Sequence, residues 1–242
     1  MRPEVDGLMV LDRAAKRREE DPYTDRLLGV GDIEVCVDAS RFEVDLNRER
    51  DAAVYRVPDD AWGLEVWDGV PDDEIVAGSL ARYDEFYDAL AELFDELAVD
   101  GPFVVYDLHS YNHRRAGPDA DAEPAVENPD VNVGTGSLDR ERFEPVVDAF
   151  IAAFSAAEVD GAMPDVRENV RFRGGELGRW AHARYPGRVC VLSIEFKKTF
   201  MDEWTDSLDD DHLGDLDRAL RSTAAPVRAA LARISRPPTE AR

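Results

Sequence analysis

A short apolar run that ends in side chains able to bind a metal or move a proton is the most informative stretch of the sequence. Residues 103–106 are apolar or aromatic and predict a buried strand, and the chain then delivers Asp107, His109 and His113. Asp107 and His109 are two residues apart and so share a face of the strand. Open α/β sheets build active sites from polar groups at the carboxyl ends of such strands. The alternative is that Asp107 caps a turn and His109 is a hydrogen-bonded core residue.

Three other polar clusters stand beside apolar runs. Glu195 lies near the end of the apolar run 189–196 and is followed by Lys197 and Lys198. The other two are Asp45, Asn47 and Arg48, which end the segment 40–48, and the acidic triplet Glu19-Glu20-Asp21. Each cluster alone has a plain structural alternative. Glu195 could pair with Lys197 or an Arg, the arginines could form surface ion pairs, and the triplet could be a solvated helix end.

Taken together, these side chains match the inventory of a mononuclear zinc hydrolase, which needs His and carboxylate ligands and a separate Glu. The free Glu takes a proton from water and returns it to the leaving nitrogen. An Arg beside the metal fixes a substrate carboxylate through two parallel hydrogen bonds. Nucleophilic Ser or Cys catalysis is poorly supported, because there is no GxSxG motif and Cys36 and Cys190 have no His or Asn close in sequence. Gly134 and Gly136 lack the rest of a phosphate-binding loop.

Composition limits the class of protein. The chain has 242 residues, 44% of them hydrophobic, which supports one domain with a sizeable core. Its net charge of −24 argues against nucleic acid and anionic membranes as partners. It has neither a long apolar run nor a secretory leader, so we expect a cytoplasmic protein. No pattern fixes an oligomeric state.

The make-up of the charge is also informative. Only three of the 29 basic residues are Lys, and the acidic residues are dispersed along the chain. This predicts a halophilic protein that works in high salt, where screening removes the self-repulsion. The alternative is an ordinary acidic protein.

The elements that must position these residues alternate between strand and helix. Strands are predicted at 33–37, 103–110, 131–133, 166–172 and 189–196, and helices within 2–20 and over 79–98, 140–157, 176–185 and 209–234. This order predicts one three-layer α/β domain over 1–235, with 236–242 as a frayed tail. The aromatic stripe of 79–98 is expected in the core, and Cys36 and Cys190 are expected to be small core residues.

Several of these segments, in order along the chain, resemble the N-formylglutamate amidohydrolase family. The likeness extends from about Arg2 to Thr205, and several motifs in order are more specific than any one of them. The segments that carry it are Arg18–Asp25, Ser40–Arg48, Asp107–Ser110, Asn132–Thr135, Phe172–Gly175 and Ile194–Lys198.

The resemblance implies a zinc-dependent hydrolase with a phosphorylase/hydrolase-like fold, an α/β/α sandwich around a mixed sheet, akin to zinc carboxypeptidases. By motif, it implies that His109 is a zinc ligand and that an acidic ligand comes from Asp21 or Glu20, with Asp21 favoured. Glu195 would be the general base. Family substrates are N-formyl-L-glutamate and related N-acyl amino acids, and the reaction gives formate and glutamate in histidine catabolism.

The resemblance also implies a set of substrate-binding residues. Asn47 and Arg48 would hold the α-carboxylate of the substrate, helped by Arg41 or Arg173. His113 belongs to the same group and, like Glu20, is an alternative source of a metal ligand.

The sequence departs from the family at one point. The first zinc ligand of the family is a His in a short His-x-Gly segment, and this chain has no His before His109. We expect the true start to lie upstream of Met1. The alternatives are a catalytically impaired protein that binds an acidic metabolite, or an amidohydrolase for another N-acyl amino acid.

Overall fold

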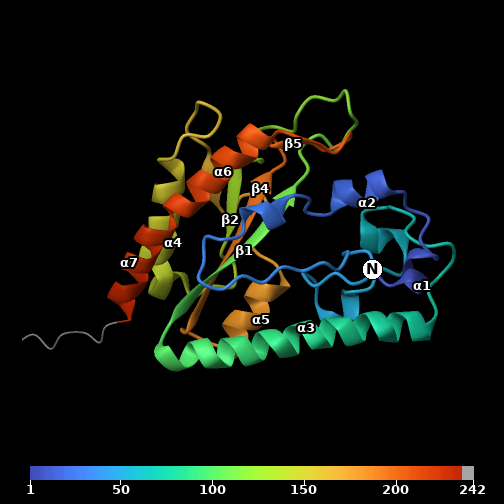
Figure 1. Ribbon diagram of the computed structural model, residues 1–242, viewed down its shortest axis with the longest axis horizontal. Coiled ribbons are helices and arrows are strands. Elements are labelled where there is room, and N and C mark those ends of the chain that lie inside the picture. Colours follow the sequence, from blue (N-terminus) through green and yellow to red (C-terminus); the bar gives the residue numbers. More distant parts are fainter. Residues whose placement is uncertain (236–242) are drawn as a thin grey trace, which may run out of the picture.

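The computed structural model describes residues 1–235, and its centre is a four-stranded sheet (Figure 1). The strand order is β1-β4-β2-β3. The strands are β1 (Phe103–Tyr111), β2 (Val131–Gly134), β3 (Val166–Glu168) and β4 (Val189–Lys197). β1 and β4 are parallel, whereas β2 runs antiparallel to β4, so the sheet is mixed, as expected.

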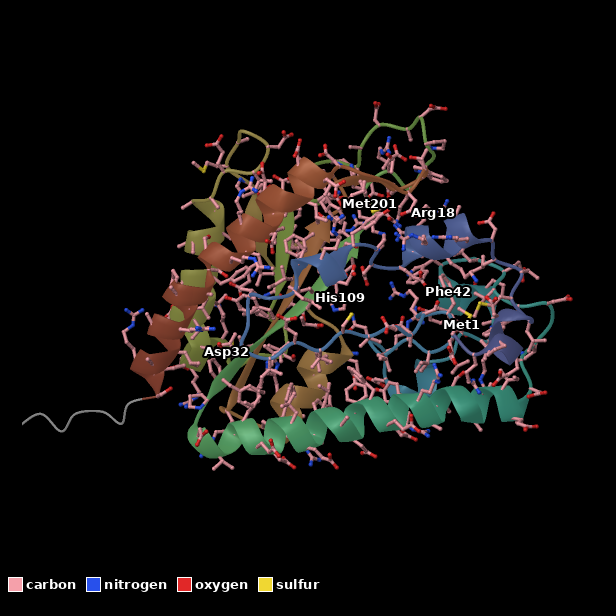
Figure 2. All side chains as sticks on the ribbon, viewed as in Figure 1. Met1, Arg18, Asp32, Phe42, His109 and Met201 are labelled. Atoms are coloured by element: carbon pink, nitrogen blue, oxygen red, sulfur yellow. The ribbon has the colours of Figure 1, made fainter. Side chains whose placement is uncertain are left out.

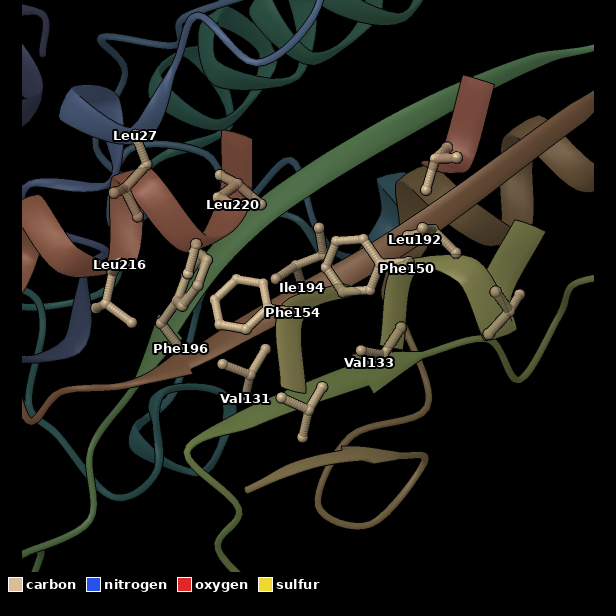
Figure 3. Packing of buried hydrophobic residues seen from close by; sticks show 14 of the residues in the cluster. Leu27, Val131, Val133, Phe150, Phe154, Leu192, Ile194, Phe196, Leu216 and Leu220 are labelled. Carbon is tan, nitrogen blue, oxygen red and sulfur yellow. The ribbon is translucent and has the colours of Figure 1, made fainter. Parts of the chain in front are cut away.

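Helices cover both faces of this sheet and make the three predicted layers. One face packs against α4 (Arg140–Ser155), α6 (Asp210–Ser222) and α7 (Ala224–Ile234). Figure 3 shows Phe150 and Phe154 of α4 beside Ile194 and Phe196 of β4 in this core. The opposite face packs against α5 (Glu176–Arg184) and the long helix α3 (Asp73–Asp100).

The alternation of side chains along the strands decides what each face carries. Cys190, Leu192, Ile194 and Phe196 of β4 are buried in the core formed with α4. Val189 and Val191 pack against α5 and α3, so Ser193 and Glu195 follow them on that second face. In β1 the same face carries Phe103 and Val105, and then Asp107 and His109. The polar residues therefore lie where this face extends beyond α5.

The amino-terminal half of α3 supports a second, smaller core beside the sheet. This core includes Val5, Phe42, Tyr55, Trp67 and Val76. The remaining elements are short: α1 (Pro3–Asp6), α2 (Arg13–Glu19), η1 (Thr24–Leu27), η2 (Arg50–Ala52), η3 (Pro58–Ala61), β5 (Met201–Asp202) and β6 (Ser207–Leu208). The aromatic stripe of α3 packs inward as predicted, with Tyr83, Tyr87, Leu90 and Phe94 buried. Within residues 1–235, every helix is too short or too polar to cross a bilayer.

Residues 33–37 do not form the predicted strand. Ile33, Val35 and Val37 alternate in strand fashion, but this segment pairs with no strand among the described residues. Its apolar side chains are 44–52% exposed, and Cys36, expected in the core, is exposed as well. A segment with an alternating apolar pattern forms a strand only where a neighbouring strand takes up its backbone hydrogen bonds. The pattern itself does not show whether such a neighbour exists. Cys190 is buried, as predicted.

Two other elements differ in extent. β3 ends at Glu168, short of the predicted 172, because the side-chain oxygen of Asn132 accepts hydrogen bonds from the Val170 and Arg171 amides and bends the chain. The predicted helix 209–234 is two helices that meet at Thr223. Pro226, near the start of α7, has no N–H to continue the ladder of α6. The predicted tail 236–242 lies outside the described residues.

Candidate active site

Three of the predicted site residues lie together on the second face of the sheet. β1 and β4 are parallel and in a register that pairs His109 with Glu195, so the two side chains project from neighbouring positions on one face. Asp21, in the link between α2 and η1, completes the group with its Oδ2 3.5 Å from Nδ1 of His109. Figure 2 shows His109 on β1 beside this amino-terminal segment.

Asp21 is fixed by contacts with β1. The backbone amide of Ser110 donates to its Oδ1 at 2.7 Å, and the Ser110 hydroxyl donates to the same atom at 3.1 Å. Burial raises the pKa of Asp21, but the hydrogen bond and charge of His109 outweigh it and hold the pKa well below the usual range. The carboxylate of Asp21 is therefore ionised beside the charged imidazole of His109.

His109 is held between two carboxylates. Its buried Nε2 lies 2.9 Å from Oδ1 of Asp107, a charge contact without hydrogen-bond alignment. Burial lowers the pKa of His109, but Asp107 and Asp21 outweigh it and raise the pKa well above the ordinary value. With Nε2 turned to Asp107, Nδ1 is the atom that faces Asp21.

Glu195 has the electrostatics of a proton-transfer group. It is 8% exposed, and burial raises its pKa to about 7, with Asp21 and Asp107 adding to the rise and His109 and Arg41 opposing it. A general base works best when its pKa lies near the working pH. The alternative of an ion pair with Lys197 does not hold, because that lysine pairs with Asp130 at 2.5 Å.

Arg41 lies near this group and shares a buried carboxylate with Arg48. Asp45, with 3% of its side chain exposed, lies 3.0 Å from Nη2 of Arg41 and 3.5 Å from Nε of Arg48. Arg41 also donates to the Glu19 carbonyl at 2.7 Å. Both guanidinium groups lie over the ring of Trp62, at 5.0 and 5.6 Å. These arginines are thus oriented by buried partners and are not the surface ion pairs of the alternative reading.

The loop that carries Asn47 and Arg48 is held by two helices. The Asn47 side-chain oxygen accepts from the Glu176 amide at 2.9 Å, at the start of α5. A Cβ at Gly175 would lie 1.6 Å from that oxygen, so any other residue there would displace the Asn47 side chain. Two tyrosines of α3 complete the support, with their hydroxyls donating to the carbonyls of Arg48 and Leu46 at 3.0 and 2.7 Å. Asn47 therefore positions this loop as well as being a candidate substrate contact.

Three predicted site residues have other surroundings. The Glu20 carboxylate accepts a hydrogen bond from the Ser40 hydroxyl. His113 lines a separate cavity of about 760 Å³, has Glu203 at 3.7 Å, and has its pKa lowered to about 4, mainly by burial. Arg173 is exposed, and no ion pair involves it among residues 1–235. The structure thus brings together Asp21, His109 and Glu195, with Arg41 beside them and Arg48 linked to Arg41 through Asp45.

The donor atoms present fit part of a zinc site. Within residues 1–235, no three His, Cys, Asp or Glu side chains are grouped around one metal position. Asp21 and His109 supply two donors. Two atoms bound to a tetrahedral zinc at 2.0–2.1 Å are about 3.3 Å apart, close to the 3.5 Å between Oδ2 and Nδ1. Asp107 lies beside the other ring nitrogen, on the side where metal-binding histidines usually have a carboxylate partner.

Some contributors were not identified from sequence. Ser110 lies inside the Asp107–Ser110 motif, so the motif could have indicated that this residue contacts the site. Tyr55, Trp62, Tyr83 and Tyr87 had no polar pattern around them that distinguished a supporting role from simple core packing.

Comparison with known proteins finds a matching family and a shared fold. The family model described as N-formylglutamate amidohydrolase matches residues 1–201 of this chain. None of the curated proteins matches it. The chain is similar to the crystal structure of N-formylglutamate amidohydrolase from Ralstonia eutropha JMP134, with a TM-score of 0.70 and 19% identity over 94% of this chain and 89% of that chain. At this identity the likeness shows a shared fold.

Proposed function

Because this chain belongs to the N-formylglutamate amidohydrolase family, we propose that it hydrolyses N-formyl-L-glutamate, or a related N-acyl amino acid, with a divalent metal at the Asp21–His109 pair. Water adds to the acyl carbon, the amide C–N bond breaks, and the products are formate and L-glutamate. The observation that carries the proposal is the convergence of Asp21, His109 and Glu195 from three separate segments onto one face of the sheet.

Glu195 is the proton carrier in this proposal. Its carboxylate accepts a proton from the attacking water and then donates it to the leaving nitrogen, which departs as the amine. A pKa of about 7 allows both steps near neutral pH.

The arginines beside this group hold the substrate. A guanidinium group binds a carboxylate through two parallel N–H···O bonds, which fixes both its distance and its orientation. Arg48 is the anchor for the α-carboxylate, since 29% of its side chain is exposed and Asp45 holds its Nε side. Arg41 carries its charge close to Asp21 and Glu195.

Asp21 and His109 are the chain's own ligands for the metal, and zinc suits their oxygen and nitrogen donors. When bound, the ion supplies Lewis acidity to the substrate carbonyl. Other divalent ions share these ligand preferences. Comparing zinc, cobalt and manganese in the activity assay identifies the metal that supports turnover.

The test measures formate release from N-formyl-L-glutamate by the purified, zinc-loaded protein and by Glu195→Gln. We expect the variant to lose at least about 100-fold in kcat while it still binds zinc, because Gln keeps the shape but cannot carry the proton. Glu203→Gln is the matched control, since Glu203 is also buried, at 2% exposed, but accepts from the backbone amides of His113 and Arg114. Undiminished turnover in Glu195→Gln contradicts the role given to Glu195.

A second candidate is a protein that keeps the pocket and binds an acidic metabolite without hydrolysing it. The presence of only two grouped metal donors among the described residues favours it. Calorimetric binding of L-glutamate together with no formate release from wild type would support this candidate. A panel of N-formyl, N-acetyl and longer N-acyl derivatives of Glu, Gln and Asp separates the first candidate from an amidohydrolase of other specificity.

A further inference from the structure

A buried lysine binds the segment that carries Asp21 to the ends of the sheet strands, in addition to the contact that Arg41 makes with the Glu19 carbonyl. Lys198 directly follows β4 and is 1% exposed. Its Nζ donates to the carbonyls of Arg18 and Glu20 at 2.6 and 2.8 Å, and to the side-chain oxygen of Asn112 at 3.0 Å. Two of these acceptors are at the end of α2, immediately before Asp21, and the third directly follows β1.

The ammonium group of Lys198 has no donor left for a substrate. A lysine has three N–H donors, and each has an acceptor here. Burying such a charge costs several kcal/mol unless it is paired and hydrogen-bonded. Burial lowers the pKa of Lys198 to about 8, and the nearby carboxylates of Asp21, Glu19 and Glu203 oppose that shift and favour the charged form. Lys198 therefore stabilises the positions of the groups that accept its hydrogen bonds.

The contacts of Lys198 link the three segments that supply the site. The link after α2 supplies Asp21, β1 supplies His109, and β4 supplies Glu195. The Lys198 backbone adds to this link, because its amide donates to the carbonyl of Tyr111, the last residue of β1, at 3.0 Å. The link that carries Asp21 forms no strand of the central sheet, so side-chain contacts must fix its position.

We propose that Lys198 is the positioning residue of this site: its ammonium fixes the end of α2 against the carboxyl ends of β1 and β4 and thereby seats Asp21 beside His109. The inference rests on the proposed function for its catalytic consequence, but the seating of Asp21 is measurable without any substrate. The reporter is the Ser110 amide, which donates to Asp21 Oδ1 at 2.7 Å.

The experiment compares Lys198→Met with wild type by hydrogen exchange followed by NMR. Met keeps an unbranched stem of similar length but cannot donate, so both α2 carbonyls lose their partner. We expect exchange of the Ser110 amide to be at least 10-fold faster. Zinc affinity, measured by competition with a chromophoric chelator, should fall at least 10-fold, and kcat should fall with KM within about 3-fold.

Lys197→Met is the matched control. Lys197 is the neighbouring residue, also at the end of β4, but it ties down the β1–β2 loop through Asp130 at 2.5 Å and the Asn128 carbonyl at 3.2 Å. This variant should leave Ser110 exchange and zinc affinity as in wild type. If both variants change these readouts equally, or if neither does, the positioning role is wrong.

Asn112→Ala keeps the experiment decisive if Lys198→Met does not fold. It removes one of the three acceptors and should accelerate Ser110 exchange in the same direction but less, whereas unchanged exchange overturns the proposal. A wild-type protein that releases no formate would refute the proposed function alone, since the exchange measurement still decides whether Lys198 seats Asp21.

Discussion

The carboxylate of Asp107 lies beside the imidazole of His109 and influences both its charge and its orientation. Only 11% of its side chain is exposed; one oxygen lies 2.9 Å from Nε2 of His109, and the Ser193 hydroxyl donates to the other at 3.3 Å. This contact directs the remaining ring nitrogen of His109 to Asp21. Asp107 is therefore a group that acts through His109 and need not touch the substrate.

Replacing Asp107 by Asn should lower zinc affinity and kcat/KM by about 10- to 100-fold, because the neutral amide no longer orients and polarises the imidazole. Chelator competition and formate release measure the two quantities. Ser193→Ala, which removes only the hydroxyl that donates to Asp107, should change each by less than about 3-fold. Equal effects of the two variants would contradict this role of Asp107.

At the level of elements, the sequence predicted best where a pattern reports on one element alone. The sequence of β4 shows a run of apolar residues with Glu195 near its end, and the sequence of α3 shows an apolar stripe at helical spacing. The pairing of β1 with β4 then brings His109 beside Glu195 without further information. The family motifs added Asp21, which no local pattern distinguishes from its acidic neighbours.

Most of what the sequence did not show depends on contacts between distant segments. The segment 33–37 has the period of a strand but lacks a partner among residues 1–235. The tyrosines of α3 fit the core pattern, and only the fold shows that Tyr83 reaches the carbonyl of Arg48. Likewise, Lys198 bonds to carbonyls 178 and 180 positions away, a distance over which no sequence pattern extends.

The contact of α5 with β4 contains a histidine that should make stability depend on pH. β2 pairs with β4 only as far as Ser193, so the Val191 amide has no partner in β2 and donates instead to Nε2 of His182 at 3.1 Å. Nδ1 of His182 lies 2.8 Å from the hydroxyl of Ser137. The ring must be neutral to accept at Nε2, and burial lowers its pKa to about 4.

A pKa that is lower in the folded than in the unfolded state stabilises the fold above the unfolded value of about 6.5, and this stability is lost as pH falls toward 4. We expect His182 to contribute about 1–2 kcal/mol to that loss, after allowance for its partly exposed ring. Urea unfolding of wild type and His182→Gln at pH 7.5 to 4.5 measures it, since Gln can accept from Val191 without titrating. Parallel pH profiles for the two proteins would exclude this contribution.

At the scale of the whole molecule, the dominant feature is the net charge of −24. The outer face of α3 illustrates its arrangement, with Glu85, Asp88, Glu92 and Glu96 all exposed and three or four residues apart. Like charges at these spacings destabilise a helix by about 0.2–0.5 kcal/mol per pair at low salt. The basic residues that could balance them are mostly arginines committed to ion pairs elsewhere, such as Arg41 and Arg48 with Asp45.

Salt should therefore stabilise this protein. Raising KCl from 0.1 to 1 M shortens the Debye length from about 10 to 3 Å, which screens the repulsion between exposed carboxylates more than the buried ion pairs of the site. We expect the free energy of unfolding, measured by urea denaturation, to rise by on the order of 2 kcal/mol, the sum of several such pairs. Charge reversal on α3, with Glu85, Glu92 and Glu96 replaced by Lys, should reduce that gain. If the wild-type protein is equally stable in dilute buffer and in 1 M KCl, its acidic surface is not an adaptation to salt.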